Sequence, residues 1–490
     1  MARSEHELYP DYTPEIEAII EQGITESLLT HIIDKHKDNA QYNRNLYNRY
    51  MTLEGEVPIF NREPRFTIKA VNGKAPKQIN NKINNDFMGE IVDFKVGYFS
   101  GKPISYTYSG TEESEVDTGG DEEVKKAKKV LSDFVTRNNM FDIDMETTKH
   151  ASIYGYAGRL FYHDTDGNER VMAIPGYETI VLSQTSIMEP EYAIRYYATK
   201  DITGMEVWIV EFYDDQKITV YEGQLHSLTK KQELDNLYGF CPLQGIQNNN
   251  EMLGDAEKVL SEIDAYDRVV SDSSNQIEGQ VHSKEIYENV NITQEEIALG
   301  NYTGALSFHN GTGNGKIYKL ESNINDGFVE HHLERLKDNI YRFSKTPNLD
   351  DPKFGTSAGI ALKFKLTGLE AKCSMYQAKM MTAGVYMFKL LASAWAKKGH
   401  QIDPLQCIME FKRNLPVDVL AEAQTAQQLI GAGLPREYVY SLLSVVDDVD
   451  YVMQLIEQEM SGYPSLETNL PEDEETETRQ NLRKNQEINF

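Results

Sequence analysis

The sequence predicts an α+β fold that is mainly helical. Apolar residues recur every three or four positions over long stretches before residue 155 and after residue 249, which is typical of amphipathic helices. Between residues 158 and 228 the pattern changes to short runs of β-branched and aromatic residues separated by turn residues. A chain of 490 residues exceeds what one hydrophobic core organises, so we expect two to four substructures.

The N-terminal third is predicted to be helical. Thr13 precedes a proline and has the residue type of an N-cap, and a second helix is expected to begin near Thr25. Further helices are predicted over Asp86–Phe99, Glu122–Asn138 and Asp142–Tyr154. The stretch 111–123 consists mostly of acids, glycines and hydroxyl residues, which predicts a mobile loop.

The β-rich block predicts an antiparallel meander, because its runs are short and turn signals lie between them. The runs are Arg159–His163, Glu169–Ile174, Tyr192–Tyr197, Glu206–Tyr213 and Lys217–Tyr221. The segment Asp164–Gly167 is the clearest of the turns.

Two long helices are predicted to bracket a small strand region. Asn250–Val281 is the first, and the second begins near Asp326 with apolar residues spaced alternately four and three, a narrow stripe suited to another helix. Residues 283–322 break into short strands around glycine-rich turns. These strands are Glu285–Tyr287, Ala305–Phe308 and Lys316–Leu320. The pattern predicts a stalk with a tip.

A loop and a very long helix follow. Residues 346–359 contain prolines and glycines that cannot continue a helix. Beyond this loop a helical segment is predicted over Ser357–Lys398, interrupted by three glycines. Residues 417–460 predict three more helices, and the acidic residues 466–490 predict a disordered tail.

Charge limits the functions that the chain can have. It contains 49 basic and 77 acidic residues, giving a formal net charge of −28. Proteins that grip nucleic acid usually carry a basic surplus, so tight non-specific DNA binding is not expected of the surface as a whole. A polyanion could still pass without sticking. Charge alone favours the simpler interpretation, which is that the acidic residues keep the chain soluble.

The cysteines and the apolar runs predict the compartment. Cys241, Cys373 and Cys407 are scattered and odd in number, which predicts a reducing environment without a disulfide framework. No apolar run approaches the roughly 20 residues that span a bilayer. The N-terminal residues lack the apolar core of a secretory signal, so we expect no membrane association and assembly in a cytoplasm.

One segment formally matches a hydrolase motif. Gly355–Gly359 has the G-x-S-x-G pattern, with Ser357 in the place of the nucleophile. That motif needs a buried strand before the serine, whereas prolines and polar residues precede this one. The competing interpretation is a flexible loop in which Ser357 caps the following helix.

The other chemical motifs are incomplete. Residues 311–316 lack the first glycine and the hydroxyl residue of a phosphate loop. Asp164–Gly167 lacks the acid expected at the twelfth position of a calcium loop. His331 and His332 have no third ligand at helical spacing. We therefore predict no metal site, no cofactor and no catalytic residues.

Several blocks resemble the portal proteins of long-tailed, siphovirus-type bacteriophages, a family of phages that infect mainly Gram-positive bacteria. The matching blocks are Asp86–Ile104, Ser152–Ala157, Cys241–Glu251, Ile263–Asp267 and Thr346–Glu370. Their order agrees with the family from about residue 25 to 460. The last block is the most specific, because it resembles the family's tunnel loop and the kinked helix after it.

The resemblance implies a portal fold with four named regions and a ring of subunits. The wing would comprise residues 1–248, with helices and the β-meander, together with residues 346–400, which hold the tunnel loop and the long kinked helix. The stem would comprise 249–282 and 326–345, the clip 283–325 and the crown 401–465. The tail, 466–490, would follow the crown.

The resemblance also implies a function and partners. The ring, expected to contain twelve copies, would sit at one capsid vertex in the virion and conduct double-stranded DNA during packaging and ejection. Terminase and a head–tail connector protein would dock at the clip end, and the major capsid and scaffolding proteins at the wing. The alternatives are a serine acyl hydrolase that uses Ser357, or a scaffolding or adaptor protein without a channel.

The candidate site is the tunnel loop, expected to line the DNA channel. Its residues are Thr346, Pro347, Asn348, Leu349, Asp350, Asp351, Pro352, Lys353, Phe354, Gly355, Thr356 and Ser357. Asp350 and Asp351 would repel phosphate and Lys353 could touch it, so contacts with DNA should be weak and reversible. A loop placed between two helices is where moving contacts are usually carried.

Overall fold

The computed structural model describes residues 8–64, 79–110, 120–281, 285–288, 293, 295, 315–319, 326–349, 359–414 and 419–443, with seven further residues between 445 and 456. The chain divides into two compact units, Met1–Asn414 and Leu415–Phe490. The first contains both helices and sheets, and the second is helical in its described residues. The predicted α+β class is therefore confirmed.

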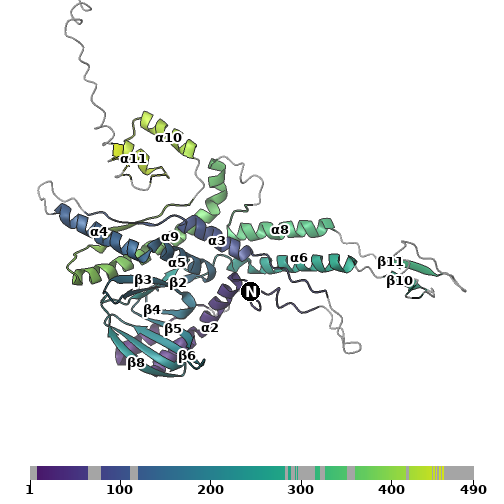
Figure 1. Cartoon of the computed structure of the whole chain (residues 1–490), viewed down its shortest axis with the longest axis horizontal. Helices are drawn as coiled ribbons and strands as arrows, with labels where there is room; N and C mark the ends of the chain where they lie inside the picture. The colour runs from purple at the N-terminus through teal and green to yellow at the C-terminus, as the bar shows by residue number, and fades with distance from the viewer. Residues whose placement is uncertain are drawn as a thin grey trace, which may run out of the picture. The chain divides into compact units, whose positions relative to one another are not determined.

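The helices of the first unit follow the predicted order closely (Figure 1). They are α1 (Thr13–Gln22), α2 (Glu26–Tyr50), α3 (Phe87–Ser100), α4 (Gly120–Asn138), α5 (Met140–Tyr154), α6 (Leu260–Val281), α8 (Asp326–Ser344) and α9 (Gly359–Lys397). Short 3-10 turns occur at Gly176–Glu178, Glu257–Val259 and Pro404–Gln406. Local signals fix several ends, because the Thr25 hydroxyl accepts the Leu28 N–H at 3.2 Å and Asp86 caps α3 through Gly89.

The strands form four antiparallel sheets within the described residues. They are β1 (Ser105–Tyr108), β2 (Tyr156–His163), β3 (Glu169–Pro175), β4 (Thr179–Leu182), β5 (Tyr192–Lys200), β6 (Glu206–Tyr213), β7 (Lys217–Gln224), β8 (Ser227–Asp235), β9 (Leu243–Gln247), β10 (Glu285–Glu288), β11 (Lys316–Lys319) and β12 (Cys407–Glu410). The sheet orders are β4-β5-β6-β7-β8, β3-β2-β9, β10-β11 and β1-β12.

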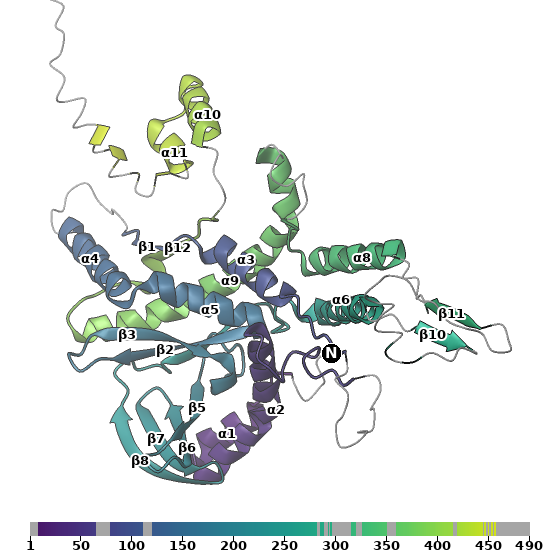
Figure 2. The same cartoon turned by 45° about the vertical axis from the view of Figure 1, so that its right-hand side comes forward.

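The five-stranded sheet packs one face against α1 and α2 (Figure 2). Ile16 and Leu29 of the helices meet Val210 and Phe212 of β6 in a core where none of the four is more than 2% exposed. The sheet face that these strands bury alternates with an outward face, as antiparallel strands require. This layer contains three of the five runs of the predicted meander, in β5, β6 and β7.

The outer edge of that sheet is β8, which is exposed except at Leu228. The pairing of β7 with β8 shifts register, because Val220 faces Gln232 whereas Tyr221 faces Lys230. Lys231 therefore has no residue opposite it, which is the arrangement of a β-bulge.

The three-stranded sheet places β2 between β3 and β9. Tyr156 and Phe161 of β2 are fully buried. On the β9 side, Gln244 donates a hydrogen bond to the carbonyl of Ala383 in α9 at 3.1 Å, which fixes the long helix against the sheet.

A third core joins the roots of α6 and α8 to the body. Ile91 of α3, Ile153 of α5, Ile263 of α6 and Ile340 of α8 are buried together in it. From this core α6 and α8 run side by side (Figures 1 and 2). The chain between them contains the antiparallel pair β10–β11, so the predicted pair of helices around a small strand region is present.

The fourth sheet joins two strands that are far apart in the sequence. β12 pairs with β1, with Ser105 opposite Glu410 and Tyr108 opposite Cys407. Beyond it the N–H of Asn414 donates to the carbonyl of Tyr98 at 2.9 Å. Residues 401–414 thus belong to the first unit, whereas the crown was expected to begin at 401.

The second unit contains α10 (Val419–Gly431) and α11 (Arg436–Ser441). Ala426 and Val439 are its buried residues on these helices. The third helix predicted for this region falls mostly outside the described residues, as do the strand Ala305–Phe308, the tail and residues 111–119 of the acidic loop predicted over 111–123. The last four residues of that predicted loop are instead helical, because α4 begins at Gly120.

Three local predictions are wrong. The helix expected from Asn250 begins at Leu260, because residues 248–254 form a turn in which Asn249 Oδ1 accepts the Leu253 N–H at 2.9 Å. Met252 in this turn has a φ of +51°, which a helix cannot accommodate.

The second correction concerns the meander, which is two sheets rather than one. The runs in β2 and β3 belong to the three-stranded sheet, since the Gly176–Glu178 turn leads the chain away before β4. The third concerns Thr13, which is the first residue of α1 and not its cap. Its hydroxyl donates to Asp11 Oδ1 at 2.7 Å.

The predicted interruptions of the long helix are also absent from its hydrogen-bonded span. α9 is continuous over Gly359–Lys397. Gly384 instead allows a close approach, because a Cβ there would lie 2.2 Å from the sulfur of Met409 in β12.

Candidate channel loop and its anchor

The predicted tunnel loop begins where α8 ends. Lys345 has a φ of +59°, and the Thr346 N–H donates to the carbonyl of Tyr341 at 3.1 Å, which closes the helix. Thr346 and Pro347 are buried, Asn348 is half-buried and Leu349 is exposed. The other predicted site residues, 350–357, lie outside the described residues, so the arrangement of the loop beyond Leu349 is not part of the site described here.

Lys372 of α9 fastens the start of the loop. Its Nζ donates to the carbonyl of Ser344, the last residue of α8, at 2.8 Å. The same Nζ lies 2.7 Å from Oδ1 of Asp255, which precedes α6. Gly368, one turn earlier on α9, lies beside Lys345, and a Cβ there would make an ordinary contact with the Lys345 Cβ at 3.4 Å. One lysine of α9 therefore contacts both the end of α8 and the segment that precedes α6.

Asp255 has a second lysine partner. Nζ of Lys95, from α3, lies 2.8 Å from Asp255 Oδ2 and also donates to Asn248. The Lys95 and Asp255 side chains are 1% and 2% exposed. The Lys95 ammonium also lies 4.7 Å from the centroid of the Tyr376 ring. We call Lys95, Asp255 and Lys372 the anchor triad.

Electrostatics holds the anchor triad in its charged form. Burial alone would raise the pKa of Asp255, but the two lysines outweigh it and hold that pKa well below its ordinary value. Burial lowers the pKa of Lys95, and Asp255 offsets part of this effect. A carboxylate between two ammonium groups thus stays ionised at neutral pH, and it crosslinks three elements that are distant in sequence.

Two glycines allow the backbone around Asp255 to pack tightly. Gly155, at the end of α5, has a φ of +101°, and a Cβ there would lie 1.9 Å from the carbonyl oxygen of Met252. At Gly254 a Cβ would lie 2.2 Å from the carbonyl oxygen of Ile153. Two backbone hydrogen bonds cross the same contact, from Asp255 to Ser152 and from Asn248 to Gly155. The segment 248–255, which precedes α6, is therefore held by backbone hydrogen bonds as well as by the ion pairs of Asp255.

A second buried ion pair lies within the body. Arg159 of β2 donates to Asp144 of α5 and, through Nε, to Thr147 at 3.1 Å. The Tyr106 hydroxyl of β1 donates to the other Asp144 oxygen at 2.8 Å. Burial raises the pKa of Asp144, and Arg159 opposes that rise. This pair ties β1, α5 and β2 together.

The chemistry of these clusters is structural. The charged groups of the anchor triad pair with one another. The two lysines also donate hydrogen bonds, Lys95 to the Asn248 side chain and Lys372 to the Ser344 carbonyl. Among the described residues, no group of three or more His, Cys, Asp or Glu is arranged to hold a metal ion. Ser357, on which the hydrolase alternative depends, lies outside the described residues.

No helix in the described part of the chain is both long and apolar enough to cross a membrane.

Sequence reasoning missed the anchor triad, although part of its signal was present. Lys95 lies one turn from Ile91 and from Phe99, on the buried face of α3. A lysine on such a face is rarely left without a partner. Nothing local indicates that this partner is Asp255.

The comparison with known proteins defines the class of the chain. The family described as phage portal protein, SPP1 Gp6-like, matches residues 29–463. The chain therefore belongs to this family of phage portal proteins, which confirms the resemblance seen in the sequence. Portal proteins are structural components of the virion.

Two curated relatives agree with this assignment. The chain is 24% identical over 428 residues to the portal protein of Bacillus phage SPP1, which covers 81% of this chain and 79% of that protein. It is 24% identical over 407 residues to the portal protein of Clostridium phage phiCD119, which covers 78% and 86% respectively.

Proposed function

We propose that the chain assembles into a dodecameric ring at one capsid vertex, and that double-stranded DNA passes through the axial channel during packaging and ejection. The observation that carries this proposal is the placement of the loop 346–358. It joins α8 to α9, and the anchor triad fixes its root to α3, α6 and α9. A segment that contacts a moving polymer needs a rigid base, and the anchor triad supplies one.

The proposed regions follow the order of elements. The wing comprises 1–248 and 346–400, the stem 249–282 and 326–345, and the clip 283–325. For the crown, expected over 401–465, the pairing of β12 with β1 favours a border after Asn414.

The proposed partners are those of a DNA-packaging vertex. Terminase and a head–tail connector protein dock at the clip, and the major capsid and scaffolding proteins contact the wing. Assembly takes place in the host cytoplasm. The net charge of −28 supports a conduit, because an acidic surface has few sites that trap a polyanion.

The test is to shorten the loop by deleting residues 350–355. We expect soluble rings that still join procapsids but package little DNA, because contacts with the passing duplex are lost while the anchored root remains. The readout is packaged DNA per procapsid. A matched control deletes the exposed β5–β6 turn, Ile202–Gly204, which should package normally. Full packaging with the shortened loop would rule out the channel role of this segment.

A further inference from the structure

α6 and α8 leave an apolar groove between them. Its volume is about 500 Å³, and its floor is formed by Val270 and Ile277 of α6 and by Val329 and Leu333 of α8. Ile277 is 60% exposed. Folded proteins rarely expose a contiguous apolar surface unless another molecule binds there. We therefore expect a partner to cover this groove.

The rim of this groove is acidic on the α8 side. Asp326 and Glu330 line it, and both are exposed. With 3.6 residues per turn, they share one face of α8 with Val329 and Leu333. Neither acid forms an ion pair with another residue in the described parts of the chain. The groove therefore combines an apolar floor with unpaired negative charge.

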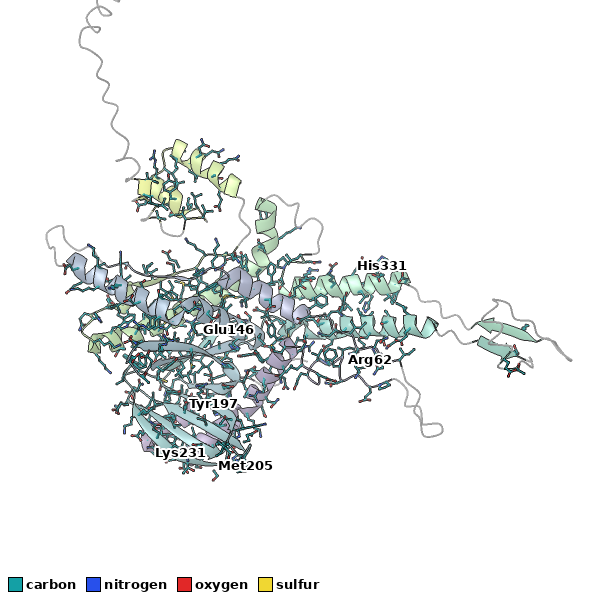
Figure 3. The ribbon with its side chains drawn as sticks, in the orientation of Figure 1. Arg62, Glu146, Tyr197, Met205, Lys231 and His331 are labelled. Atoms are coloured by element: carbon teal, nitrogen blue, oxygen red, sulfur yellow. The ribbon has the colours of Figure 1, made fainter. Side chains whose placement is uncertain are left out.

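The opposite side of α8 carries the complementary charge. Arg335 follows Asp326 by nine residues, which is two and a half turns, so the two side chains leave the helix in opposite directions. Arg335 is exposed and forms no ion pair with a residue in the described ranges. His331, labelled on α8 in Figure 3, is one turn from Arg335 on the same side.

We propose that Arg335 of one copy seats at the Asp326–Glu330 rim of the next copy, so that its α8 covers the apolar floor of the neighbour's groove. This inference rests on the ring proposed above and names its stem interface. Because the arginine and the groove lie on opposite sides of α8, each copy uses one surface to receive and the other to insert. Such a head-to-tail contact repeats around a ring until the ring closes.

The spacing of the charges adds a geometric consequence. Glu330 and Arg335 are separated by five residues, or about 7.5 Å along the helix axis. Copies related by ring symmetry sit at the same height. The two charges of neighbouring copies therefore meet either because α8 is inclined to the ring axis or because the long Arg335 side chain spans this offset.

The first test is an intersubunit crosslink between Glu330→Cys and Arg335→Cys. An arginine–carboxylate pair holds its two Cα atoms farther apart than a disulfide can span, so the probe is a short bis-maleimide that reacts with both thiols. A crosslink within one copy joins no two chains, so only contact between copies should give a ladder of multimers on a denaturing gel. Each single variant and the wild-type chain, with its three native cysteines, should give no ladder.

The second test is a charge swap. Glu330→Arg and Arg335→Glu should each reduce the ring fraction several-fold, measured by light scattering, and the double swap E330R/R335E should restore it. Glu17→Arg is the matched control, because it makes the same charge change at an exposed helical position of α1, outside α6 and α8, and it should have no effect.

The outcomes separate this interface from the ring itself. A ladder together with rescue by the swap supports the interface. Wild-type rings in negative-stain images, with neither ladder nor charge effect, overturn the interface and leave the ring standing. Absence of rings from the wild-type protein overturns the proposed function instead.

Discussion

Two lysines converge on one buried carboxylate at the root of α6. Taking such charges out of water is costly, and their attraction offsets the cost only when every partner is present. Lys372 keeps some contact with solvent, being 13% exposed, whereas Lys95 has none to speak of. Lys95 is therefore the member that depends most on Asp255.

Asp255→Asn should destabilise the first unit strongly. It leaves Lys95 buried beside a neutral amide, so we expect a loss of about 3–5 kcal/mol in the free energy of unfolding. Chemical denaturation followed by circular dichroism measures this loss. Asp133→Asn removes an exposed carboxylate from the middle of α4 and should change stability by less than about 0.5 kcal/mol. Equal stability of the two variants would show that the anchor triad is not a stabilising crosslink.

Hydrogen bonds to two tyrosine hydroxyls fix the tautomer of the buried His36. The Tyr156 hydroxyl donates to the Gly176 carbonyl at 2.7 Å, so it accepts from His36 Nε2, 3.0 Å away. His36 Nδ1 then accepts from the Tyr196 hydroxyl at 2.9 Å. Both ring nitrogens are used by a neutral imidazole, and burial lowers the pKa of His36 to about 3. Burial likewise lowers the pKa of His150 to about 4.

These two histidines should make the protein less stable in mild acid. Their ordinary pKa is 6.5, so below that pH both histidines bind protons in the unfolded chain but remain neutral in the folded chain. Each contributes a loss of up to about 1.4 kcal/mol per pH unit. The loss begins as pH falls through 6.5 and continues to about pH 4 for His150 and about pH 3 for His36.

The measurement compares melting temperatures of the wild-type chain and His36→Gln from pH 8 to pH 5. The variant should be less stable at pH 8 but should lose less on acidification. The comparison is needed because Asp144 and Glu178, whose pKa values burial raises, act in the opposite direction. Parallel curves for the two proteins would contradict a neutral, buried His36.

Residue types predicted several helix ends but not the start of α6. Thr25 and Asp86 cap their helices as their side-chain chemistry suggests. The turn before α6 instead depends on backbone bonds to Ser152 and Gly155, about a hundred residues earlier. The pairing of β1 with β12 is equally non-local. The loop position was predictable from its prolines and glycines, whereas its anchor was not.

Gly155→Ala should be far more damaging than an alanine at an ordinary turn glycine. Gly155 has a positive φ, and the new Cβ would also collide with the Met252 carbonyl oxygen at 1.9 Å. The segment 248–255 would therefore have to move. Gly167 has a φ of +77° but open space around it, and Gly167→Ala should cost only about 1–2 kcal/mol. Comparing the two unfolding free energies tests the contact. If both substitutions lower the free energy of unfolding by a similar amount, the end of α5 and the segment 248–255 can separate easily.

At the scale of the whole molecule, the border between units falls after Asn414. Arg413 donates two hydrogen bonds to Glu370 of α9, both at 2.9 Å, and β12 covers β1. A chain ending at 414 should therefore unfold with the same thermal transition as the first unit of the full protein. A chain ending at 403 loses these contacts and should be at least about 2 kcal/mol less stable. If both truncations behave alike, residues 404–414 belong functionally to the second unit.

The irregular edge strand β8 has a consequence for solubility. An open, flat strand edge is a template for pairing with other molecules, and many copies held in one particle would offer such edges at high local concentration. The bulge at Lys231 breaks the regular spacing of donors and acceptors, and Lys217, Lys230 and Lys231 place charge along the same edge. Straightening and neutralising this edge should therefore make the protein aggregate through sheet extension.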